Sequence, residues 1–528
     1  MRWPELCREV EIRAQRGDPR GPCAGLHYDS RRIQPGQAFV AIQGETADGH
    51  RFIPEAIRRG AALIVSEQPP PPEAIAWLQV AHARRALAQM SANWFGRPAA
   101  RLQLIGITGT NGKTTTAWLA AAALRAAGVR TGLLGTIEYQ VGPDPASRRP
   151  SPHTTPESYD LQQLLAEMAT AGCTAAVLEV SSHALVMDRV WGCPFAAAVF
   201  TNLTQDHLDF HHTIEAYREA KRRLFAGTGA GAPRAAVVNA EDPSSAAMVA
   251  GFPGPVIAYA GPGAPLVAAP AAAADPRLTA QLRATAVTAS AEGQRIAVSA
   301  PGGWSGAIAS PLLARVNVLN TLAAFGAGLA LGLPPEALAR GLEAAPPVPG
   351  RFQRVAAGQP FTVVVDYAHT PDALANVLRL ARELAPRGRV IVVFGCGGDR
   401  DRGKRPQMGA IAAESADLAV VTSDNPRSEP PAAIIAEIAA GLVPVARRQG
   451  KRWIEEADRH AAIERALAAA APGDVVVIAG KGHEDYQIIG GERRHFSDVE
   501  EVGLAWRRLS RGAPAGSAAS SCGGGACN

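Results

Sequence analysis

A glycine-rich segment with one lysine, Gly109–Thr115 (GTNGKTT), is the part of this sequence best suited to bind a phosphate chain. It follows the apolar run Leu104–Thr108 and opens a helical pattern that continues to about Ala127. Glycines let backbone N–H groups approach phosphate oxygens, the helix N-terminus adds positive potential, Lys113 can reach the terminal phosphates and Thr114 can ligate Mg²⁺. The strict Walker spacing is absent, because its first glycine position is not a glycine. A tight strand-to-helix turn is the alternative, and we favour phosphate binding.

Two further segments place polar residues just after apolar runs and could hold a metal ion. Glu179 lies at the end of the run Ala175–Val180, where α/β folds gather functional groups. A carboxylate there suits Mg²⁺, which prefers oxygen ligands, although it could instead cap the next turn. His207 follows the run Ala197–Thr201, and Lys221 lies fourteen positions later. Taken alone, these two residues would be typical of a polar loop and of a solvated helix.

Three segments in the last third of the chain combine glycine and charged residues after predicted strands: Gly395–Arg400, Asp424–Arg427 and Gly480–Glu484. The first is not a dinucleotide-binding fingerprint, because the third glycine is missing. Arg427 is suited to bind a carboxylate through two parallel hydrogen bonds, with Asn425 as a further donor. A role for Arg427 as a surface turn residue is the alternative.

The elements that must position these residues are alternating strands and helices. Buried strands are predicted at 37–42, 61–65, 104–108, 175–180, 197–201, 235–239, 361–365, 389–394, 418–422 and 474–479. Helical patterns separate most of them, which predicts an α/β fold with parallel sheets. Residues 255–305 are rich in Ala, Pro and Gly with weak alternation and predict a peripheral hairpin region, and residues 344–350 predict a linker.

Composition limits the class of protein. The 528 residues exceed the size at which one core stops growing, and 47% hydrophobic with 19% charged residues is ordinary for a globular protein. The formal charge of +5 comes without a basic block interleaved with aromatics, so we expect no nucleic-acid binding. Eighteen-residue apolar runs and a signal-peptide pattern are absent, and the seven cysteines are scattered. We therefore expect a cytoplasmic monomer with reduced thiols and no membrane insertion.

The string TGTNGKTT resembles the ATP loop of the Mur ligases and of their relatives, the folylpolyglutamate and cyanophycin synthetases. The resemblance to the Mur ligases extends over about residues 28–495. It implies a domain at 1–98 that binds a UDP substrate, a central P-loop-type parallel-sheet ATPase domain at 99–343, and a Rossmann-like amino-acid-binding domain at 344–511. Residues 512–528 are expected to form a disordered tail.

The resemblance also implies substrate contacts. Those to ATP are Gly109, Thr110, Asn111, Gly112, Lys113, Thr114, Thr115, Asn317, Arg351, Asp366 and His369. Those to the UDP-sugar-peptide are Ser30, His50, Thr154, Thr155, Ser181 and Arg189. Those to diaminopimelate are Arg400, Asp424, Asn425, Arg427, Gly480 and Glu484.

In the Mur pattern, the lysine that matches Lys221 carries a CO₂-derived carbamate, which helps to bind a second Mg²⁺ with the histidine that matches His207. The resemblance thus implies Lys113, Glu179, His207 and Lys221 as catalytic residues. It implies Thr114, Glu179, His207 and Lys221 (as N6-carboxylysine) as metal ligands. The chemistry is coherent, because an ammonium repels Mg²⁺ whereas its carbamate is an anionic oxygen ligand. Two metal ions would neutralise charge that develops during phosphoryl transfer.

The C-terminal segments resemble those of Mur ligases that add meso-diaminopimelate. The implied reaction begins when ATP phosphorylates the γ-carboxylate of D-glutamate in UDP-N-acetylmuramoyl-L-alanyl-D-glutamate. The diaminopimelate amine then displaces phosphate, as the domains close. Lysine lacks the distal carboxylate, so it would leave Arg427 buried and unpaired at a cost of about 3–5 kcal/mol. That corresponds to roughly 10²–10³-fold discrimination.

Two alternatives stay open. One is the same fold with another acceptor: a Mur ligase that adds lysine or D-Ala-D-Ala, or a folylpolyglutamate synthetase. The uridine-type segments Tyr28–Arg31 and Asp48–His50 disfavour the folate enzyme, and Asp424–Arg427 disfavours lysine. The other is a catalytically inactive nucleotide-binding scaffold, which the four intact catalytic candidates disfavour.

Overall fold

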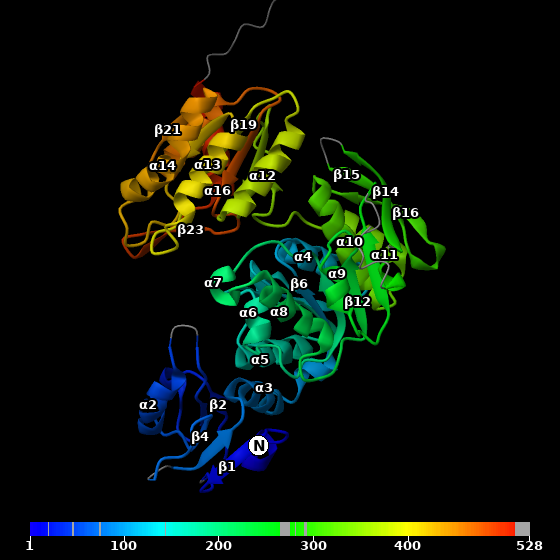
Figure 1. The fold of residues 1–528 in the computed structure, drawn as a ribbon, viewed down its shortest axis with the longest axis vertical. Coiled ribbons are helices and arrows are strands. Elements are labelled where there is room, and N and C mark those ends of the chain that lie inside the picture. The colour runs from blue at the N-terminus through cyan, green and yellow to red at the C-terminus, as the bar shows by residue number, and fades with distance from the viewer. Residues whose placement is uncertain are drawn as a thin grey trace, which may run out of the picture. The chain divides into compact units, whose positions relative to one another are not determined.

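The computed structural model describes residues 1–512 apart from 20, 45–46, 73–74, 143, 264–274, 280 and 290–292. The chain divides into two compact units, residues 1–346 and 347–528. Within the described residues, the first unit holds a five-stranded and an eleven-stranded sheet, and the second holds a six-stranded sheet and a two-stranded ribbon (Figure 1). The exact boundaries of the three predicted domains stay a prediction.

The N-terminal sheet has the strand order β1-β5-β4-β3-β2. Its strands are β1 (Ile12–Arg16), β2 (Leu26–His27), β3 (Ala38–Val40), β4 (Leu63–Ser66) and β5 (Trp77–Val80). Strands β2 to β5 pair in parallel, and β1 pairs antiparallel with β5. Its helices are α1 (Trp3–Leu6), η1 (Ser30–Arg32), η2 (Gly49–Phe52), α2 (Ile53–Arg58) and α3 (Ala83–Trp94). The chain leaving β2 and β3 therefore runs into η1 and η2, which carry Ser30 and His50.

The central sheet has the order β16-β15-β14-β13-β12-β11-β6-β10-β7-β8-β9. Its strands are β6 (Gln103–Thr108), β7 (Thr131–Leu134), β8 (Glu138–Gln140), β9 (Arg148–Pro150), β10 (Ala175–Glu179), β11 (Phe195–Phe200), β12 (Ala235–Asn239), β13 (Val256–Ala260), β14 (Leu282–Ala289), β15 (Gln294–Ser299) and β16 (Ser305–Ser310). The run from β14 to β7 is parallel, and both outer ends are antiparallel. Because β10, β6 and β11 are neighbours, the loops after them meet at one edge.

Helices cover this sheet and fix the start of the phosphate loop. They are η3 (Pro98–Arg101), α4 (Lys113–Ala126), η4 (Pro145–Ser147), α5 (Ser158–Thr170), α6 (Ser182–Val186), α7 (Leu208–His211), α8 (Ile214–Ala226), α9 (Ser245–Val249), η5 (Pro276–Leu278), η6 (Pro301–Gly303), α10 (Arg315–Ala330) and α11 (Pro335–Glu343). Helix α4 packs against α10 and α11. Gly341 permits this approach, because a Cβ there would lie 2.7 Å from the Ala123 Cα.

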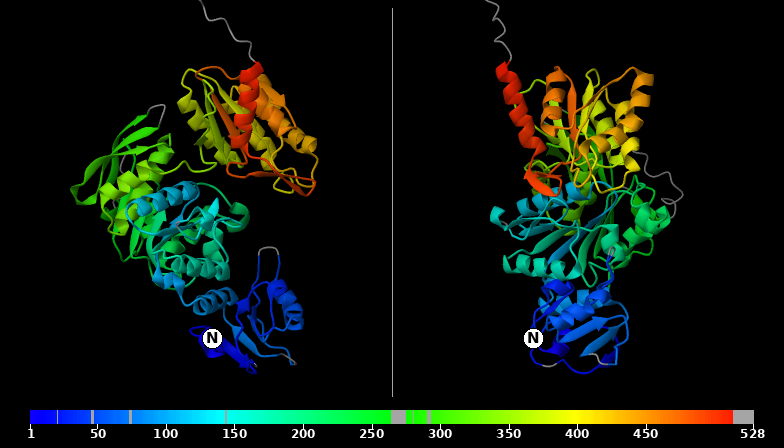
Figure 2. Two further views of the ribbon diagram at one scale, coloured as in Figure 1. Left: turned by 180° about the vertical axis from the view of Figure 1, so that it is seen from behind. Right: turned by 90° about the vertical axis from the view of Figure 1, so that its left-hand side faces the viewer.

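The C-terminal sheet has the order β17-β18-β22-β19-β20-β21, parallel from β18 to β21. Its strands are β17 (Gln353–Arg354), β18 (Thr362–Asp366), β19 (Val390–Phe394), β20 (Leu418–Val421), β21 (Arg452–Glu455) and β22 (Val475–Ala479), and the separate ribbon is β23 (Tyr486–Ile489) with β24 (Glu492–His495). The helices are α12 (Pro371–Leu384), α13 (Lys404–Ser415), α14 (Pro431–Gln449), α15 (Arg459–Ala469) and α16 (Asp498–Gly512). Helices lie on both faces of this sheet, with α15 and α16 packed on one of them (Figure 2).

The structure confirms the α/β fold class and the parallel sheets, with every predicted strand present within a few residues of its expected bounds. The region 255–305 needs a correction. Its later part forms the predicted antiparallel hairpin β14–β15, but β13 continues the parallel sheet beside β12. Five apolar residues in an Ala/Pro/Gly-rich setting gave too short a periodic signal to distinguish this strand. The helix α16 reaches Gly512, and the rest of the predicted tail lies outside the described residues.

Two further predictions concern thiols and membranes. The five cysteines in the described part of the chain are free, as expected for reduced thiols. Among the helices of that part, none has both the length and the apolar character that a membrane crossing requires.

Candidate functional site

The phosphate loop connects β6 to α4, and two of its glycines are required by their surroundings. Gly109 (φ 151°) and Gly112 (φ 83°) both lie in the region that favours glycine. A Cβ at Gly109 would lie 1.9 Å from the Thr201 Oγ1, and one at Gly112 would lie 2.4 Å from the Asn320 Oδ1. Among the described residues, no side chain caps the N-terminus of α4. The first N–H groups of an α-helix have no carbonyl partner within the helix, and helix N-termini bind anions for this reason.

The loop is held by the segment after β11. The Asn111 N–H donates to the Asn202 Oδ1 at 2.9 Å, and the Asn111 carbonyl accepts from the Thr201 Oγ1 at 2.7 Å. The Thr110 N–H donates to the Asn202 carbonyl at 2.8 Å. Thr115 lies buried in the first turn of α4. These contacts hold the predicted loop residues in one turn between β6 and α4.

Two lysines from distant parts of the sequence converge on this loop. The Lys113 Nζ donates to the carbonyls of Gly109 and Thr110 at 2.9 and 2.8 Å. The Lys221 Nζ, from α8, donates to the same Gly109 carbonyl at 2.8 Å. The structure therefore brings these two predicted catalytic residues together.

Lys221 lies in an environment that disfavours an ammonium. Its side chain is buried, and its Nζ lies 4.2 Å from the centre of the Tyr217 ring. Burial, followed by the charge of Lys113, lowers the pKa of Lys221 well below its usual range. A neutral amine is the form that attacks CO₂, because its lone pair forms the N–C bond and the nitrogen then loses a proton. The site is therefore chemically suited to carbamate formation.

Glu179 lies at the end of β10, facing the first turn of α4. Its Oε2 accepts from the Thr114 Oγ1 at 2.8 Å and from the Thr136 Oγ1 at 3.1 Å, and its Oε1 accepts from the Thr136 N–H at 2.8 Å. Thr136 follows β7, the strand beside β10, and the sequence analysis missed it. The sequence feature that could have indicated Thr136 is a Gly-Thr pair directly after a short apolar run. The carboxylate and the two hydroxyls form an oxygen-rich pocket of the kind that Mg²⁺ prefers.

His207 lies close to the same loop. Its ring centre is 4.8 Å from that of His183 and 6.1 Å from that of Tyr217, the residue beneath Lys221. Burial, opposed by Asp206, lowers the pKa of His207, which favours the neutral, metal-binding imidazole. Within the described ranges, no three His, Cys, Asp or Glu side chains gather as a ready metal site. The metal ligands Thr114, Glu179, His207 and carbamylated Lys221 stay a prediction.

Asn317 reaches the phosphate loop through a second asparagine. The Asn320 Nδ2 donates to the Asn317 Oδ1 at 3.0 Å, and the Asn320 Oδ1 accepts from the Thr116 Oγ1 at 3.4 Å. All three side chains are buried. Asn317 thus stands behind the loop and positions Asn320 against Gly112.

The residues predicted to contact the dipeptide gather beside Glu179. The Thr154 Oγ1 lies 3.0 Å from that of Thr136, and the Thr155 Oγ1 donates to the Glu179 carbonyl at 2.8 Å. The Ser181 N–H donates to the Thr155 Oγ1, and the Arg189 Nη1 donates to the Thr155 carbonyl at 3.2 Å. The Arg189 Nε lies 3.5 Å from the Glu157 Oε2, so this guanidinium is already paired with a carboxylate of the protein.

The predicted uridine contacts lie in η1 and η2, after two neighbouring parallel strands. The Ser30 Oγ donates to Glu55 at 3.2 Å, and the His50 Nδ1 lies 2.6 Å from the Asp48 Oδ1. Within the described part of the chain, the buried Nε2 atoms of His50 and His27 have no partner. Burial lowers the pKa of His27 to about 4, and its Nδ1 accepts from the Asp29 N–H, so its Nε2 carries the proton. Sequence reasoning missed His27, which lies at the end of a two-residue strand.

The predicted nucleotide contacts of the C-terminal unit surround the end of β18. The Asp366 carboxylate accepts from the N–H groups of Phe352 and Ala368 at 2.7 and 2.8 Å. Burial raises the pKa of Asp366, although Arg351 opposes this. Arg351 lies over the Tyr367 ring at 5.1 Å, and the His369 Nδ1 is 2.8 Å from the Tyr367 carbonyl.

A buried polar cluster forms where the segments after β20 and β22 meet. The Asn425 Nδ2 donates to the Glu484 Oε2 at 2.8 Å. The Lys481 Nζ lies 3.2 Å from the Asn425 Oδ1, 3.4 Å from the Glu484 Oε2 and 3.6 Å from the Asp424 Oδ1. Two carboxylates thus share one ammonium. The excess negative charge suits a ligand that brings an ammonium of its own.

Arg427 and Gly480 complete this pocket. The Arg427 Nη1 donates to the Gly398 carbonyl at 2.7 Å, and its backbone pairs with β23. Gly480 (φ 117°) lies against the Asp424 carboxylate. A Cβ at Gly480 would be 3.6 Å from the Asp424 Cγ. Arg400 is exposed, but it borders Gly397, as Arg427 does. A Cβ at Gly397 would lie 2.9 Å from the Arg427 Nη1. Sequence reasoning missed Lys481, because a lysine between two glycines is typical of an exposed loop.

Replacing Lys481 with methionine is expected to destabilise the C-terminal unit by about 3–5 kcal/mol near neutral pH, since two carboxylates lose their counter-charge. Burial raises the pKa of Glu484, and Lys481 lowers it. Without Lys481, the pKa of Glu484 should therefore rise further. A raised carboxyl pKa stabilises the fold below the ordinary glutamate value, and that contribution is lost as the pH rises through the folded pKa. The loss should therefore shrink as the pH falls through the raised pKa of Glu484 toward the ordinary glutamate value. Urea denaturation followed by circular dichroism measures it.

Lys451→Met is the matched control, because the Lys451 Nζ donates to a backbone carbonyl on the surface. Its effect on stability should be small at every pH. A Lys481→Met destabilisation that does not change with pH would contradict the charge-sharing arrangement.

Three family models match successive parts of this chain. The model described as Mur ligase family, catalytic domain, matches residues 22–95; the Mur ligase middle domain matches 107–328; and the Mur ligase glutamate ligase domain matches 350–482. A UDP-N-acetylmuramoyl-L-alanyl-D-glutamate–2,6-diaminopimelate ligase from Solibacter usitatus is 47% identical over 90% of this chain and 91% of that protein. One from Geobacter metallireducens is 44% identical over 97% and 99%. A solved structure with this name has a TM-score of 0.66 at 34% identity, and the match covers 97% of this chain and 99% of that one.

Proposed function

This chain belongs to the Mur ligase family, and we propose that it joins meso-diaminopimelate to UDP-N-acetylmuramoyl-L-alanyl-D-glutamate, using ATP, in peptidoglycan synthesis. The observation that carries this assignment is the polar cluster of the C-terminal unit, where Lys481 and Asn425 contact Glu484, Lys481 lies 3.6 Å from Asp424, and Arg427 follows on the same segment as Asp424 and Asn425. An amino acid with a carboxylate and an ammonium at its far end matches these charges.

The proposed first step is phosphoryl transfer. A γ-carboxylate oxygen of D-glutamate attacks the γ-phosphorus of ATP, the bond from that phosphorus to the bridging oxygen breaks, and ADP leaves. The loop Gly109–Gly112 and the N-terminus of α4 bind the phosphates through backbone N–H groups. The Lys113 ammonium, now bonded to two loop carbonyls, is within reach of the same oxygens. Thr155, Ser181 and Arg189 hold the acidic peptide beside them.

Two Mg²⁺ ions and a carbamate on Lys221 are part of the proposal. Glu179 and Thr114 would hold one ion, and His207 with carbamylated Lys221 would hold the other. The ions supply positive charge that offsets the negative charge growing between carboxylate and phosphate. Support comes from the oxygen-rich setting of Glu179 and from the buried Lys221 amine.

The second proposed step forms the amide. The neutral amine of diaminopimelate attacks the acyl carbon, the tetrahedral intermediate expels phosphate with both electrons of the C–O bond, and the nitrogen gives up one proton to the departing phosphate. Arg427 holds the distal carboxylate through parallel hydrogen bonds, and the carboxylates of Asp424 and Glu484 receive the distal ammonium. No side chain of the protein becomes covalently attached, so positioning provides most of the rate. We propose that the enzyme works as a cytoplasmic monomer.

Oxygen labelling tests the acyl phosphate. With ¹⁸O in the γ-carboxylate of D-glutamate, each turnover should transfer one labelled oxygen to phosphate, because the attacking oxygen leaves with it. The product should be the UDP-linked tripeptide, identified by its mass. Unlabelled phosphate, or AMP in place of ADP, would contradict this mechanism.

A further inference from the structure

The two walls of the amino-acid pocket follow strands that are not neighbours. Asp424, Asn425 and Arg427 follow β20, whereas Gly480 to Glu484 follow β22, and β19 lies between these strands. Sheet hydrogen bonds therefore do not directly set the spacing between the two walls at their carboxyl ends. The side chains of Asn425 and Lys481 make contacts between the walls, and a buried arginine adds a link between the two backbones.

Arg459, the first residue of α15, spans that gap. Its Nη1 donates to the Ser423 carbonyl at 3.3 Å, directly before Asp424. Its Nη2 donates to the Ala479 carbonyl at 3.1 Å, directly before Gly480. One planar guanidinium thus binds the backbone of both walls at the residue where each begins.

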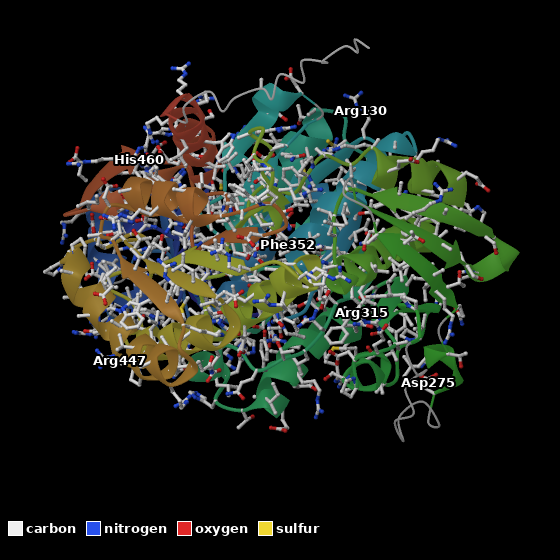
Figure 3. All side chains as sticks on the ribbon, turned by 90° about the horizontal axis from the view of Figure 1, so that it is seen from above. Arg130, Asp275, Arg315, Phe352, Arg447 and His460 are labelled. Atoms are coloured by element: carbon white, nitrogen blue, oxygen red, sulfur yellow. The ribbon has the colours of Figure 1, made fainter. Side chains whose placement is uncertain are left out.

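Asp498, the first residue of α16, fixes the guanidinium in place. The Arg459 Nε donates to the Asp498 Oδ1 at 2.8 Å, and its Nη2 donates to the Asp498 Oδ2 at 2.7 Å. Both side chains are fully buried. Burial opposes the charge of Arg459, but Asp498, Asp424 and Glu484 keep its pKa raised. The next residue, His460, lies at the periphery of this unit, so the burial is particular to Arg459 (Figure 3).

We propose that Arg459, held by Asp498, is a positioning residue that sets the distance between the two walls and thereby the affinity and selectivity for diaminopimelate. It touches neither substrate nor nucleotide; it acts through Asp424, Asn425, Arg427 and Glu484. The inference rests on the proposed function, because it names the pocket that function uses.

The test compares Arg459→Lys and Asp498→Asn with the wild-type protein. A lysine keeps the charge but has a single ammonium, so it cannot hold both carbonyls in one plane. The amide of the Asp498→Asn variant keeps the shape of the carboxylate and weakens the pair, leaving Arg459 on its carbonyls. We expect the KM for meso-diaminopimelate to rise by about 10–100-fold in Arg459→Lys, and by less in Asp498→Asn. The KM values for ATP and for the UDP-dipeptide should stay within about threefold, and the preference over L-lysine should fall.

Arg389→Lys is the matched control. Arg389 pairs with Asp474 through two hydrogen bonds of 2.6 and 3.0 Å, but both residues lie before β19 and β22, at the opposite ends of these strands. It should lower thermal stability without moving the KM for diaminopimelate.

Each outcome decides the matter. A KM for diaminopimelate that rises only in the Arg459 and Asp498 variants supports the proposal. Equal effects in the control, unchanged KM values in folded variants, or failure of both variants to fold would overturn it, because the pair would then be structural. If the wild-type protein does not use diaminopimelate, the proposed function fails instead, so the two failures are distinguishable.

Discussion

Replacing Lys221 with alanine is expected to lower kcat by about 10³-fold or more, because in the proposed mechanism the second metal would lose its anionic ligand and the phosphoryl transfer its charge compensation. Lys221 is well placed for this role, since its nitrogen donates to the Gly109 carbonyl and lies over the Tyr217 ring. A small carboxylate such as formate or acetate should restore part of the activity by occupying the space of the carbamate. Phosphate release under saturating substrates measures both effects.

Arg222→Ala is the control on the same helix, because Arg222 pairs with Glu219 on the surface. It should keep nearly full activity. As an independent readout, ¹³C-labelled bicarbonate should give a carbamate resonance in the wild-type protein that Lys221→Ala lacks. Full activity of Lys221→Ala would remove the carbamate from the mechanism.

Replacing Arg427 with methionine is expected to remove most of the discrimination between meso-diaminopimelate and L-lysine, roughly 10²–10³-fold in the ratio of kcat/KM values. With lysine bound, the wild-type guanidinium is desolvated without a carboxylate partner, and that cost of about 3–5 kcal/mol disappears in the variant. The variant should in addition lose some activity with diaminopimelate, because it loses two charge-assisted hydrogen bonds to the distal carboxylate. Initial rates with both amino acids measure the ratio.

Arg465→Met serves as its control, because Arg465 lies on α15 with an exposed side chain and pairs with Glu456, in the segment after β21. The ratio should not move in that variant. An Arg427→Met protein that still rejects lysine as strongly as the wild type would show that another group reads the distal carboxylate.

Two buried lysines illustrate how environment divides one residue type into two roles. Lys221 meets a carbonyl and an aromatic ring, and its burial disfavours the ammonium. Lys481 is equally buried but lies between Asp424 and Glu484. In the proposed mechanism the first environment prepares an amine for CO₂, whereas the second places an ammonium between two carboxylates that share it. Sequence context alone does not separate these cases.

The parts of the site that the sequence predicted are those where local chemistry is distinctive. Glycines before Lys113, an acid ending the strand before Ser181, and Asp-Asn-Pro-Arg after another strand each constrain the chain within a few residues. The structure places all of them at the ends of parallel strands, as expected.

The residues that were missed depend on contacts between distant segments. Thr136 matters because β7 is the neighbour of β10, and Arg459 matters because it bridges β20 and β22. Strand order is set by packing of the whole sheet and leaves no mark next to either residue in the sequence. For β13, five apolar residues are enough to form a strand of the sheet, but they are too few to predict that strand from the sequence.

The most direct test of the central claim is a substrate-dependence assay with the purified protein, ATP, Mg²⁺ and UDP-N-acetylmuramoyl-L-alanyl-D-glutamate. Phosphate release and the mass of the UDP-linked product are followed for meso-diaminopimelate, L-lysine and D-alanyl-D-alanine in turn. We expect stoichiometric ADP, phosphate and tripeptide with meso-diaminopimelate and little turnover with the other two. ATP consumption that requires some other acceptor, or equal use of L-lysine, would contradict the account.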